Sequence, residues 1–134
     1  SEVAIYHGRK HGDEKQAYFE KADIFAFPSY YHNETFGLVN LEAMEQKLPV
    51  VSTNEGGIPD VVRDGMNGLT CDVQSGRVSA EELANKIALL IDNPSLRYKM
   101  GEEGYRMFKS SFTIDRFEQK VTDVLSNIIE VTRL

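Results

Sequence analysis

Short apolar runs recur through the first part of the chain, and turn or polar residues follow them. They occupy Val3–Tyr6, Asp23–Phe27, Pro49–Thr53 and Gly68–Cys71. A run that is apolar at nearly every position is typical of a strand buried on both faces of a sheet. We therefore predict four strands, and we expect Asp23–Phe27 and Pro49–Thr53 to be buried on both faces.

Helical patterns separate these runs. Asp13–Lys21 sets a few apolar residues among charges, and Gly37–Gln46 is apolar along one side. Ile58–Arg63 follows a pair of glycines and has a proline near its first turn, a position that suits proline. Each of the three segments is predicted to be a helix.

Beyond the last predicted strand the pattern is helical throughout. Ser79 is followed three residues later by Glu82, which predicts a capping box at a helix start. Asn93 and Pro94 end this helix, and a second one follows. A final helix is predicted over Ile114–Val131, and we expect its apolar residues to face inward: Phe117, Val121, Val124, Leu125, Ile128 and Ile129.

Strands that alternate with helices form parallel βαβ units. The expected fold class is therefore α/β: a Rossmann-like doubly wound parallel sheet with a helical C-terminal part, in one domain over residues 1–134. Ligands of such sheets bind at the carboxyl ends of the strands. The loops His32–Leu38 and Asn54–Gly57 both follow predicted strands, so we expect them to lie side by side over one crevice.

The candidate chemistry is concentrated where the first of these loops becomes a helix. A helix N-terminus carries unpaired N–H groups and a partial positive charge, which suit a phosphate. Phe36 and Gly37 stand at this point, and a glycine lets a ligand approach the backbone closely. The candidate phosphate ligands are therefore the backbone amides of Gly37, Leu38 and Val39. The alternative, that Gly37 only helps the chain to turn, stays open.

Two carboxylates flank this turn. Glu42, in an apolar setting inside the helix, is a candidate to accept hydroxyl hydrogen bonds from a ribose, and the alternative is a solvated helix face. Glu34 precedes the helix, where compensation of the helix dipole is the simpler alternative. A glycosidase-like acid pair needs carboxyl groups ~5–9.5 Å apart. Eight helical residues rise ~12 Å, which argues against that pair without excluding it.

The second loop adds two glycines. Gly56 and Gly57 free the backbone for close approach to a ligand, and a plain turn is the alternative. The histidines show no catalytic or metal-ligand spacing, and His32 is expected at the surface. No metal is therefore expected.

The composition limits the classes of binding partner and the cellular location that we expect. The formal net charge of −6 argues against nucleic acid. The single cysteine, Cys71, excludes an internal disulfide and is expected to be a small buried residue. No apolar run of ~18 residues occurs, and the start of the chain does not resemble a signal peptide. We therefore expect a cytoplasmic protein.

Five stretches, taken together, resemble the C-terminal donor-binding domain of retaining glycosyltransferases of the GT-B fold, glycosyltransferase family 4 (group 1). The resemblance covers roughly residues 3–93, and the motifs follow the order and spacing of the family. The matching stretches are Ala22–Ser29, Glu34–Met44, Leu48–Ser52, Gly56–Asp60 and Asp64–Leu69.

The resemblance implies a role for each candidate residue. Glu34 matches the first acid of the Glu-x7-Glu motif and would act as the catalytic carboxylate near the transferred sugar, and Glu42 matches the acid that binds the nucleotide ribose. The donor would be a nucleotide diphosphate sugar, a UDP- or GDP-sugar in particular, and no cofactor or metal is implied. The implied donor-sugar and diphosphate ligands are Phe36, Gly37, Leu38, Val39, Gly56 and Gly57.

The chain also departs from the family pattern. Lys47 stands where the family has glycine, so it must adopt a left-handed conformation or the turn must differ. Asp60 replaces a more usual glutamate. Gly8-Arg9-Lys10 is not in the place of the family's diphosphate-binding cations. The N-terminal acceptor domain has no match, so we interpret the chain as a fragment, inactive alone, whose membrane association would depend on the missing part.

Topology adds an expectation about the fragment. In the sheet order 3-2-1-4-5-6, the resemblance makes Val3–Tyr6 strand three and Ile24–Phe27 strand four. The strands between them have no match, so we expect an exposed edge, abnormal pairing of Val3–Tyr6 and self-association. Two other functions stay open: a non-catalytic nucleotide-sugar-binding module, or a related GT-B enzyme such as a sugar-nucleotide epimerase or a glycogen-synthase-like glucosyltransferase.

Overall fold

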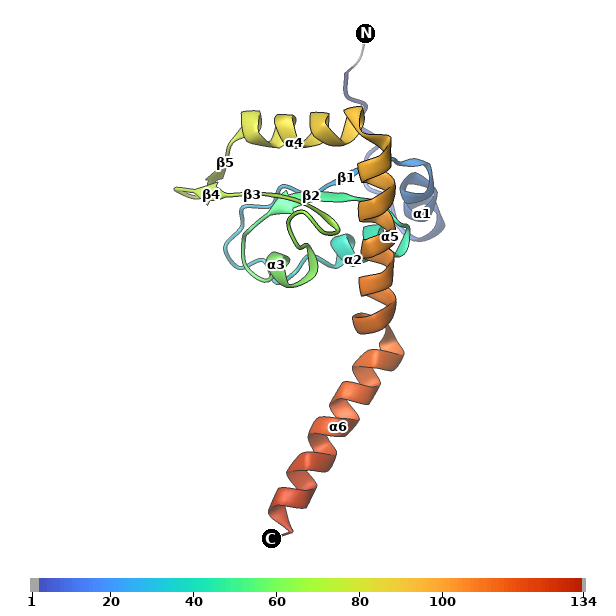
Figure 1. The fold of residues 1–134 in the computed structure, drawn as a ribbon, viewed down its shortest axis with the longest axis vertical. Coiled ribbons are helices and arrows are strands. Elements are labelled where there is room, and N and C mark those ends of the chain that lie inside the picture. Colours follow the sequence, from blue (N-terminus) through green and yellow to red (C-terminus); the bar gives the residue numbers. More distant parts are fainter. Residues whose placement is uncertain (1–2, 134) are drawn as a thin grey trace.

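A three-stranded parallel sheet with helices on both faces forms the body of the protein (Figure 1). The computed structural model describes residues 3–133. The strand order is β1-β2-β3, with β1 at Phe25–Ala26, β2 at Val50–Thr53 and β3 at Gly68–Cys71. The α/β class with parallel βαβ connections agrees with the prediction.

The helices are distributed over the two faces of this sheet. One face is covered by α2 and α3, the other by α4, and α5 packs against α2 and α4 (Figure 1). The helices are α1 (Gly12–Lys21), α2 (Leu38–Glu45), α3 (Ile58–Val61), α4 (Ala80–Asp92), α5 (Pro94–Ser111) and α6 (Ile114–Thr132).

The central strand β2 divides the hydrophobic core. All four of its residues are buried, and it pairs with β1 on one side and β3 on the other. Successive residues of a strand point to opposite faces. Val50 accordingly joins the cluster that contains Met44 and Ile58, while Val51 packs with Leu90 and Met100. The prediction that Pro49–Thr53 is buried on both faces is confirmed.

The first strand is much shorter than predicted. Only Phe25 and Ala26 form the ladder, Phe25 is half-buried and Ala26 is exposed. The expectation that Asp23–Phe27 is buried on both faces is therefore wrong. The reason is that β1 pairs with β2 alone and is the edge strand of the sheet in the part of the chain that the structure describes.

Val3–Tyr6 does not form a strand, which is a second correction. Its Val3 and Tyr6 side chains are 99% and 93% exposed, and the segment joins neither sheet within residues 3–133. A strand requires a neighbour for its backbone groups, and apolar character alone does not supply one. Pairing with another chain stays a prediction.

A small antiparallel hairpin was missed. β4 (Val73–Gln74) pairs with β5 (Arg77–Val78) across Ser75 and Gly76, so the chain after β3 is not helical throughout. Both turn residues have positive φ, 52° and 70°. This conformation matches a two-residue hairpin turn, and Ser-Gly between short alternating segments was the available signal.

The predicted cap at Ser79 is present, and Asn93 forms a second cap that was not predicted. The Ser79 hydroxyl accepts a hydrogen bond from the Glu82 amide at 3.2 Å at the start of α4. The Asn93 side chain accepts one from the Leu96 amide at 3.0 Å, with Pro94 in the first turn of α5. Side-chain oxygens at these positions satisfy amides that have no partner within the helix.

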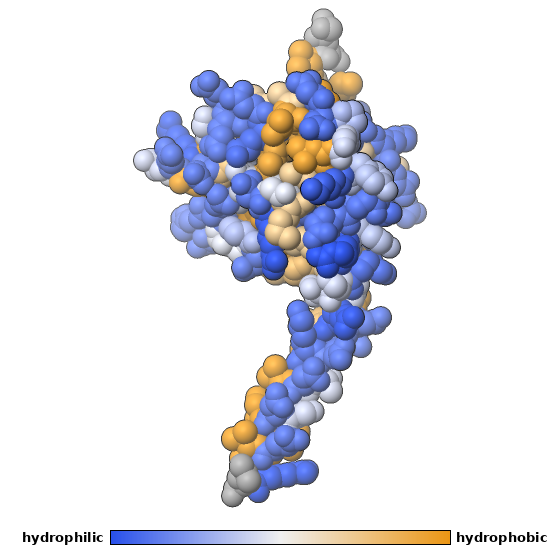
Figure 2. Space-filling view, in the orientation of Figure 1, coloured by the Kyte–Doolittle hydropathy of each residue, from blue (hydrophilic) through white to orange (hydrophobic). Residues whose placement is uncertain are grey.

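The last helix extends away from the body of the molecule (Figure 1). Hydrophobic side chains line one side of it in Figure 2, and the residues expected to face inward are exposed, Phe117 at 67% and Ile128 at 54%. That expectation is wrong within residues 3–133. No helix in this described range is long and apolar enough to cross a membrane.

The end of α2 confirms the expectation for Lys47. Its φ is 58°, in the left-handed region. The Leu48 amide donates to the Ala43 carbonyl and the Lys47 amide to the Met44 carbonyl, both at 3.0 Å. This pair of bonds is the Schellman arrangement, which normally carries glycine at the left-handed position.

Replacing Lys47 tests this strain. We expect Lys47→Gly to have a free energy of unfolding ~1 kcal/mol higher than Lys47→Ala, because only glycine removes the left-handed penalty. Lys47→Ala is the control, since both variants lose the ion pair with Glu102 and the contact with the Tyr105 ring. Chemical denaturation of the two variants gives the comparison, and equal stabilities would contradict it.

Candidate functional site

The two loops expected to share a crevice are in direct backbone contact. The Gly57 amide donates to the Glu34 carbonyl at 3.3 Å. A Cβ atom on Gly56 would overlap this carbonyl oxygen, and one on Gly57 would overlap the Thr35 carbonyl oxygen. The predicted juxtaposition is confirmed. The glycines are required for the packing of one loop on the other, and contact of Gly56 and Gly57 with a ligand stays a prediction.

The polar end of β2 holds in place the segment that leads into the first loop. The Ser52 hydroxyl donates to the Phe27 carbonyl at 2.7 Å, and the Thr53 hydroxyl donates to the Ser29 carbonyl. Both donors are fully buried. Sequence reasoning missed this role, although two polar residues at the carboxyl end of a buried strand were a signal for it.

Glu34 is tied to the same support. The Ser29 hydroxyl donates to Glu34 Oε2 at 3.1 Å, and the Glu34 amide donates to the Tyr31 carbonyl at 2.8 Å. The residue is half-buried. The Ser29 carbonyl thus accepts a hydrogen bond from β2, and the Ser29 hydroxyl orients the Glu34 carboxylate. The sequence did not identify Ser29.

The N-terminus of α2 lies at the end of this loop. Gly37 is its N-cap residue with φ 64°, and a Cβ atom there would lie 2.8 Å from Asn40 Nδ2 and 2.9 Å from Phe27 Cε1. Glycine is therefore needed for the turn. This agrees with the interpretation that Gly37 helps the chain to turn, and it is compatible with close approach of a ligand to the backbone.

The first turn of α2 presents free backbone donors. It has no side-chain cap and no acidic residue. The Asn40 amide donates to the Gly37 carbonyl at 2.9 Å, whereas within residues 3–133 the amides of Leu38 and Val39 have no acceptor. Unpaired donors and the helix dipole make this end favourable for an anion.

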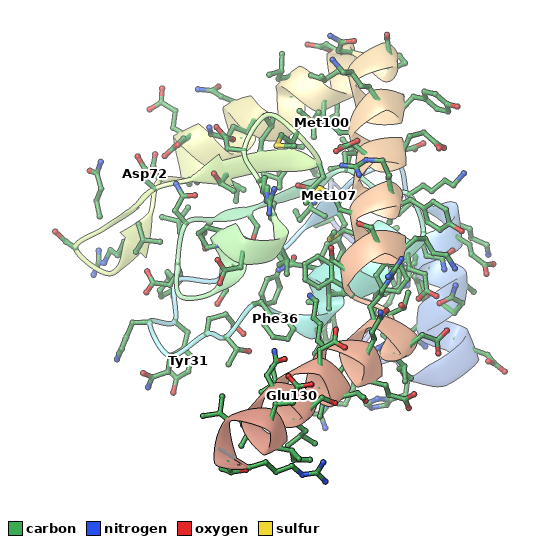
Figure 3. All side chains as sticks on the ribbon, turned by 60° about the horizontal axis from the view of Figure 1, so that its bottom comes forward. Tyr31, Phe36, Asp72, Met100, Met107 and Glu130 are labelled. Carbon is green, nitrogen blue, oxygen red and sulfur yellow. The ribbon has the colours of Figure 1, made fainter. Side chains whose placement is uncertain are left out.

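Exposed apolar and aromatic side chains surround this end. Phe36 is 37% and Leu38 is 68% exposed, and Val39 is half-buried. Tyr31 lies at the outer edge of the loop, and Phe36 lies near the start of α2 (Figure 3). His32 is exposed beside them, as expected. Exposed aromatic side chains thus lie along the loop that leads to the open N-terminus of α2.

Glu42 has a partner that the sequence did not indicate. Lys15 Nζ of α1 lies 2.6 Å from Glu42 Oε2, and both side chains are about a third exposed. Such a partly exposed pair contributes at most ~1 kcal/mol. Glu34 and Glu42 contact different groups, and the structure does not join them as an acid pair.

The remaining residues of possible chemical interest, the cysteine and the histidines, show no arrangement for catalysis or metal binding within the described residues. Cys71 is buried, as expected, and burial raises the pKa of its thiol. His7 contacts the Tyr18 ring with centroids 4.7 Å apart. Within the described residues, no three His, Cys, Asp or Glu side chains come together as a metal-binding group.

The geometry defines a class: an α/β domain with two loops in contact at the carboxyl ends of parallel strands, one of which leads into an open helix N-terminus. Such loops are where nucleotides bind in doubly wound folds. Residues 1–107 match the family of glycosyl transferases group 1. The chain belongs to this family.

Known proteins agree with this assignment. The chain is 33% identical over 121 residues to an uncharacterized glycosyltransferase of Methanocaldococcus jannaschii, covering 90% of this chain and 32% of the relative. It is 35% identical over 114 residues to D-inositol 3-phosphate glycosyltransferase of Corynebacterium glutamicum, covering 83% and 26%. Among solved structures, HepE of Anabaena in complex with UDP superposes with a TM-score of 0.74 at 26% identity, covering 82% and 29%. The chain thus spans about a third or less of the length of these proteins.

A pair of glycine substitutions tests the contact between the loops. Gly56 and Gly65 both have positive φ, 54° and 77°, but only a Cβ atom on Gly56 meets the Glu34 carbonyl. We expect Gly56→Ala to be less stable than Gly65→Ala by ~1–3 kcal/mol, because the loops must separate. Urea denaturation of both variants measures the difference. Equal losses would mean that the loop contact contributes nothing.

Proposed function

We propose that this chain is the donor-binding part of a retaining glycosyltransferase, with GT-B architecture and of glycosyltransferase family 4. In the proposed reaction, the bond between the anomeric carbon and the diphosphate breaks. The oxygen of an acceptor hydroxyl group then bonds to the same carbon with retained configuration, and the hydroxyl proton passes to the departing diphosphate. The observation that carries the proposal is the packing of the Gly56-Gly57 loop on Glu34, beside the open N-terminus of α2, in a member of the group 1 family.

The proposed donor is a nucleotide diphosphate sugar, a UDP- or GDP-sugar in particular. HepE of Anabaena has been solved with UDP and with UDP-glucose, and these complexes support the proposal. The amides of Gly37, Leu38 and Val39 would hold the diphosphate, whose developing negative charge they would stabilise. No metal or cofactor has a part in the proposed chemistry.

Each acid has its own part in this proposal. Glu34, oriented by the Ser29 hydroxyl, would lie near the transferred sugar and stabilise charge as its bond to the diphosphate breaks. Glu42 would accept hydrogen bonds from the ribose hydroxyl groups. These bonds would replace part of its contact with Lys15. Phe36, Gly56 and Gly57 would line the donor site between these two acids.

The remaining parts of the reaction would come from a longer protein. We propose that an N-terminal domain supplies the acceptor site and the cations that face the diphosphate. The exposed apolar face of α6 supports the idea of further protein that covers it. On this proposal the chain alone transfers no sugar and self-associates, and the whole protein works in the cytoplasm.

Glu34→Gln tests the catalytic assignment in the full-length enzyme. We expect turnover to fall by ~10²-fold or more, with the donor Michaelis constant changed much less, because the charge acts chiefly in the transition state. Release of sugar from the donor gives the rate. Glu45→Gln is the control, since Glu45 is an exposed acid at the opposite end of α2. Wild-type turnover in Glu34→Gln would reduce Glu34 to a dipole-compensating residue.

Glu42→Ala tests the ribose assignment. We expect the donor Michaelis constant to rise ~10-fold with turnover largely kept, because ribose contacts are equal in the ground and transition states. Lys15→Ala removes the ion pair but leaves the carboxylate, so its Michaelis constant should stay within ~3-fold of wild type. If both variants raise the donor Michaelis constant equally, the effect of Glu42→Ala comes from the lost ion pair and not from a ribose contact.

A further inference from the structure

We propose that Asn40 is a positioning residue that turns the backbone amides at the start of α2 toward the diphosphate. This inference rests on the proposed function. Asn40 is fully buried in the first turn of α2 and is not one of the residues that the sequence pattern singled out. Its bonds explain why the Phe36-Gly37-Leu38 backbone adopts one orientation.

Two hydrogen bonds from Asn40 fix two successive peptide units. The side-chain Nδ2 donates to the Phe36 carbonyl at 2.9 Å, and the backbone amide donates to the Gly37 carbonyl at 2.9 Å. In a planar trans peptide, the carbonyl and the following N–H point in opposite directions. The carbonyls held by Asn40 therefore direct the N–H groups of Gly37 and Leu38 away from Asn40.

The contact between Asn40 and Gly37 leaves no room for a side chain at position 37. A Cβ atom on Gly37 would lie only 2.8 Å from Asn40 Nδ2. Gly37 has φ 64°, a conformation that glycine adopts readily and that other residues rarely adopt. Glycine thus permits the turn, and Asn40 selects the orientation of its peptide groups.

The buried Asn40 oxygen indicates that stability alone does not explain this residue. Within residues 3–133, Asn40 Oδ1 has no hydrogen-bond partner. A buried amide oxygen without a partner is unfavourable, and leucine, which has a similar shape, would avoid that cost. The donor Nδ2 is the only part of the amide that the fold uses, and it acts on the backbone of the anion-binding turn.

Asn67 provides a matched comparison. It is also fully buried, but its amide is used at both ends: Nδ2 donates to the Val61 carbonyl at 3.0 Å, and Oδ1 accepts from the Arg63 amide at 2.8 Å. It holds the turn between α3 and β3 and contacts no residue of the first turn of α2 through these bonds. Asn67 is therefore an asparagine of equal burial with a structural role.

The test compares ligands with and without phosphate in the full-length enzyme. Calorimetric titration gives the affinity for UDP and GDP, and competition gives the affinity for uridine and guanosine. We expect Asn40→Leu to weaken binding of the preferred diphosphate about tenfold, because a backbone amide that turns away from the diphosphate loses a hydrogen bond to a charged group. The affinity for the nucleoside should stay unchanged. Asn67→Leu should lower the melting temperature and leave the ratio of the two affinities at the wild-type value.

Each outcome decides between the proposals. Unchanged diphosphate affinity in folded Asn40→Leu, or equal weakening of diphosphate and nucleoside, overturns the positioning role. Failure of the wild-type enzyme to bind either diphosphate overturns the proposed function and this inference with it. If leucine does not fit, Asn40→Ala removes the same donor without added volume and carries the same expectation.

Discussion

The burial of β2 is the constraint on which the rest of the structure depends. Every backbone group of a fully buried strand needs a partner, and β2 obtains them from β1 and β3. Its alternation then assigns Val50 to one core cluster and Val51 to the other. Helices on both faces follow from this single strand, because each apolar face has to be covered.

The candidate site is a consequence of the same strand. The last two residues of β2 are polar and buried, and their hydroxyl groups bond to the carbonyls of Phe27 and Ser29. Ser29 orients Glu34, and the Glu34 carbonyl accepts from Gly57 of the next loop. A catalytic carboxylate at this position would thus be held through hydrogen bonds that connect its loop to the buried strand β2.

Local patterns were sufficient where the cause is local. The short apolar runs predicted β2 and β3, and Ser79 predicted a cap. The family resemblance, which has glycine at the position of Lys47, implied a left-handed backbone there or a different turn, and the backbone is left-handed. Prediction failed where burial depends on a partner distant in the sequence. Within residues 3–133, Val3–Tyr6 has no neighbouring strand, and the apolar face of α6 is exposed. The ion pair between Lys15 and Glu42 joins two helices and depends on tertiary proximity. The Ser29 and Asn40 bonds span only five and four residues, but they depend on the irregular backbone of the loop before α2. The sequence therefore indicated Glu34, Gly37 and Glu42 as candidates but not the groups that hold them.

The most direct test of the central claim is a titration of the full-length protein with UDP-, GDP- and ADP-sugars, followed by backbone amide chemical shifts. If the open N-terminus of α2 binds the diphosphate, one of these donors will saturate with its largest shifts at Gly37, Leu38 and Val39. Saturation with shifts confined to other surfaces, such as the outer face of α5, would contradict the account.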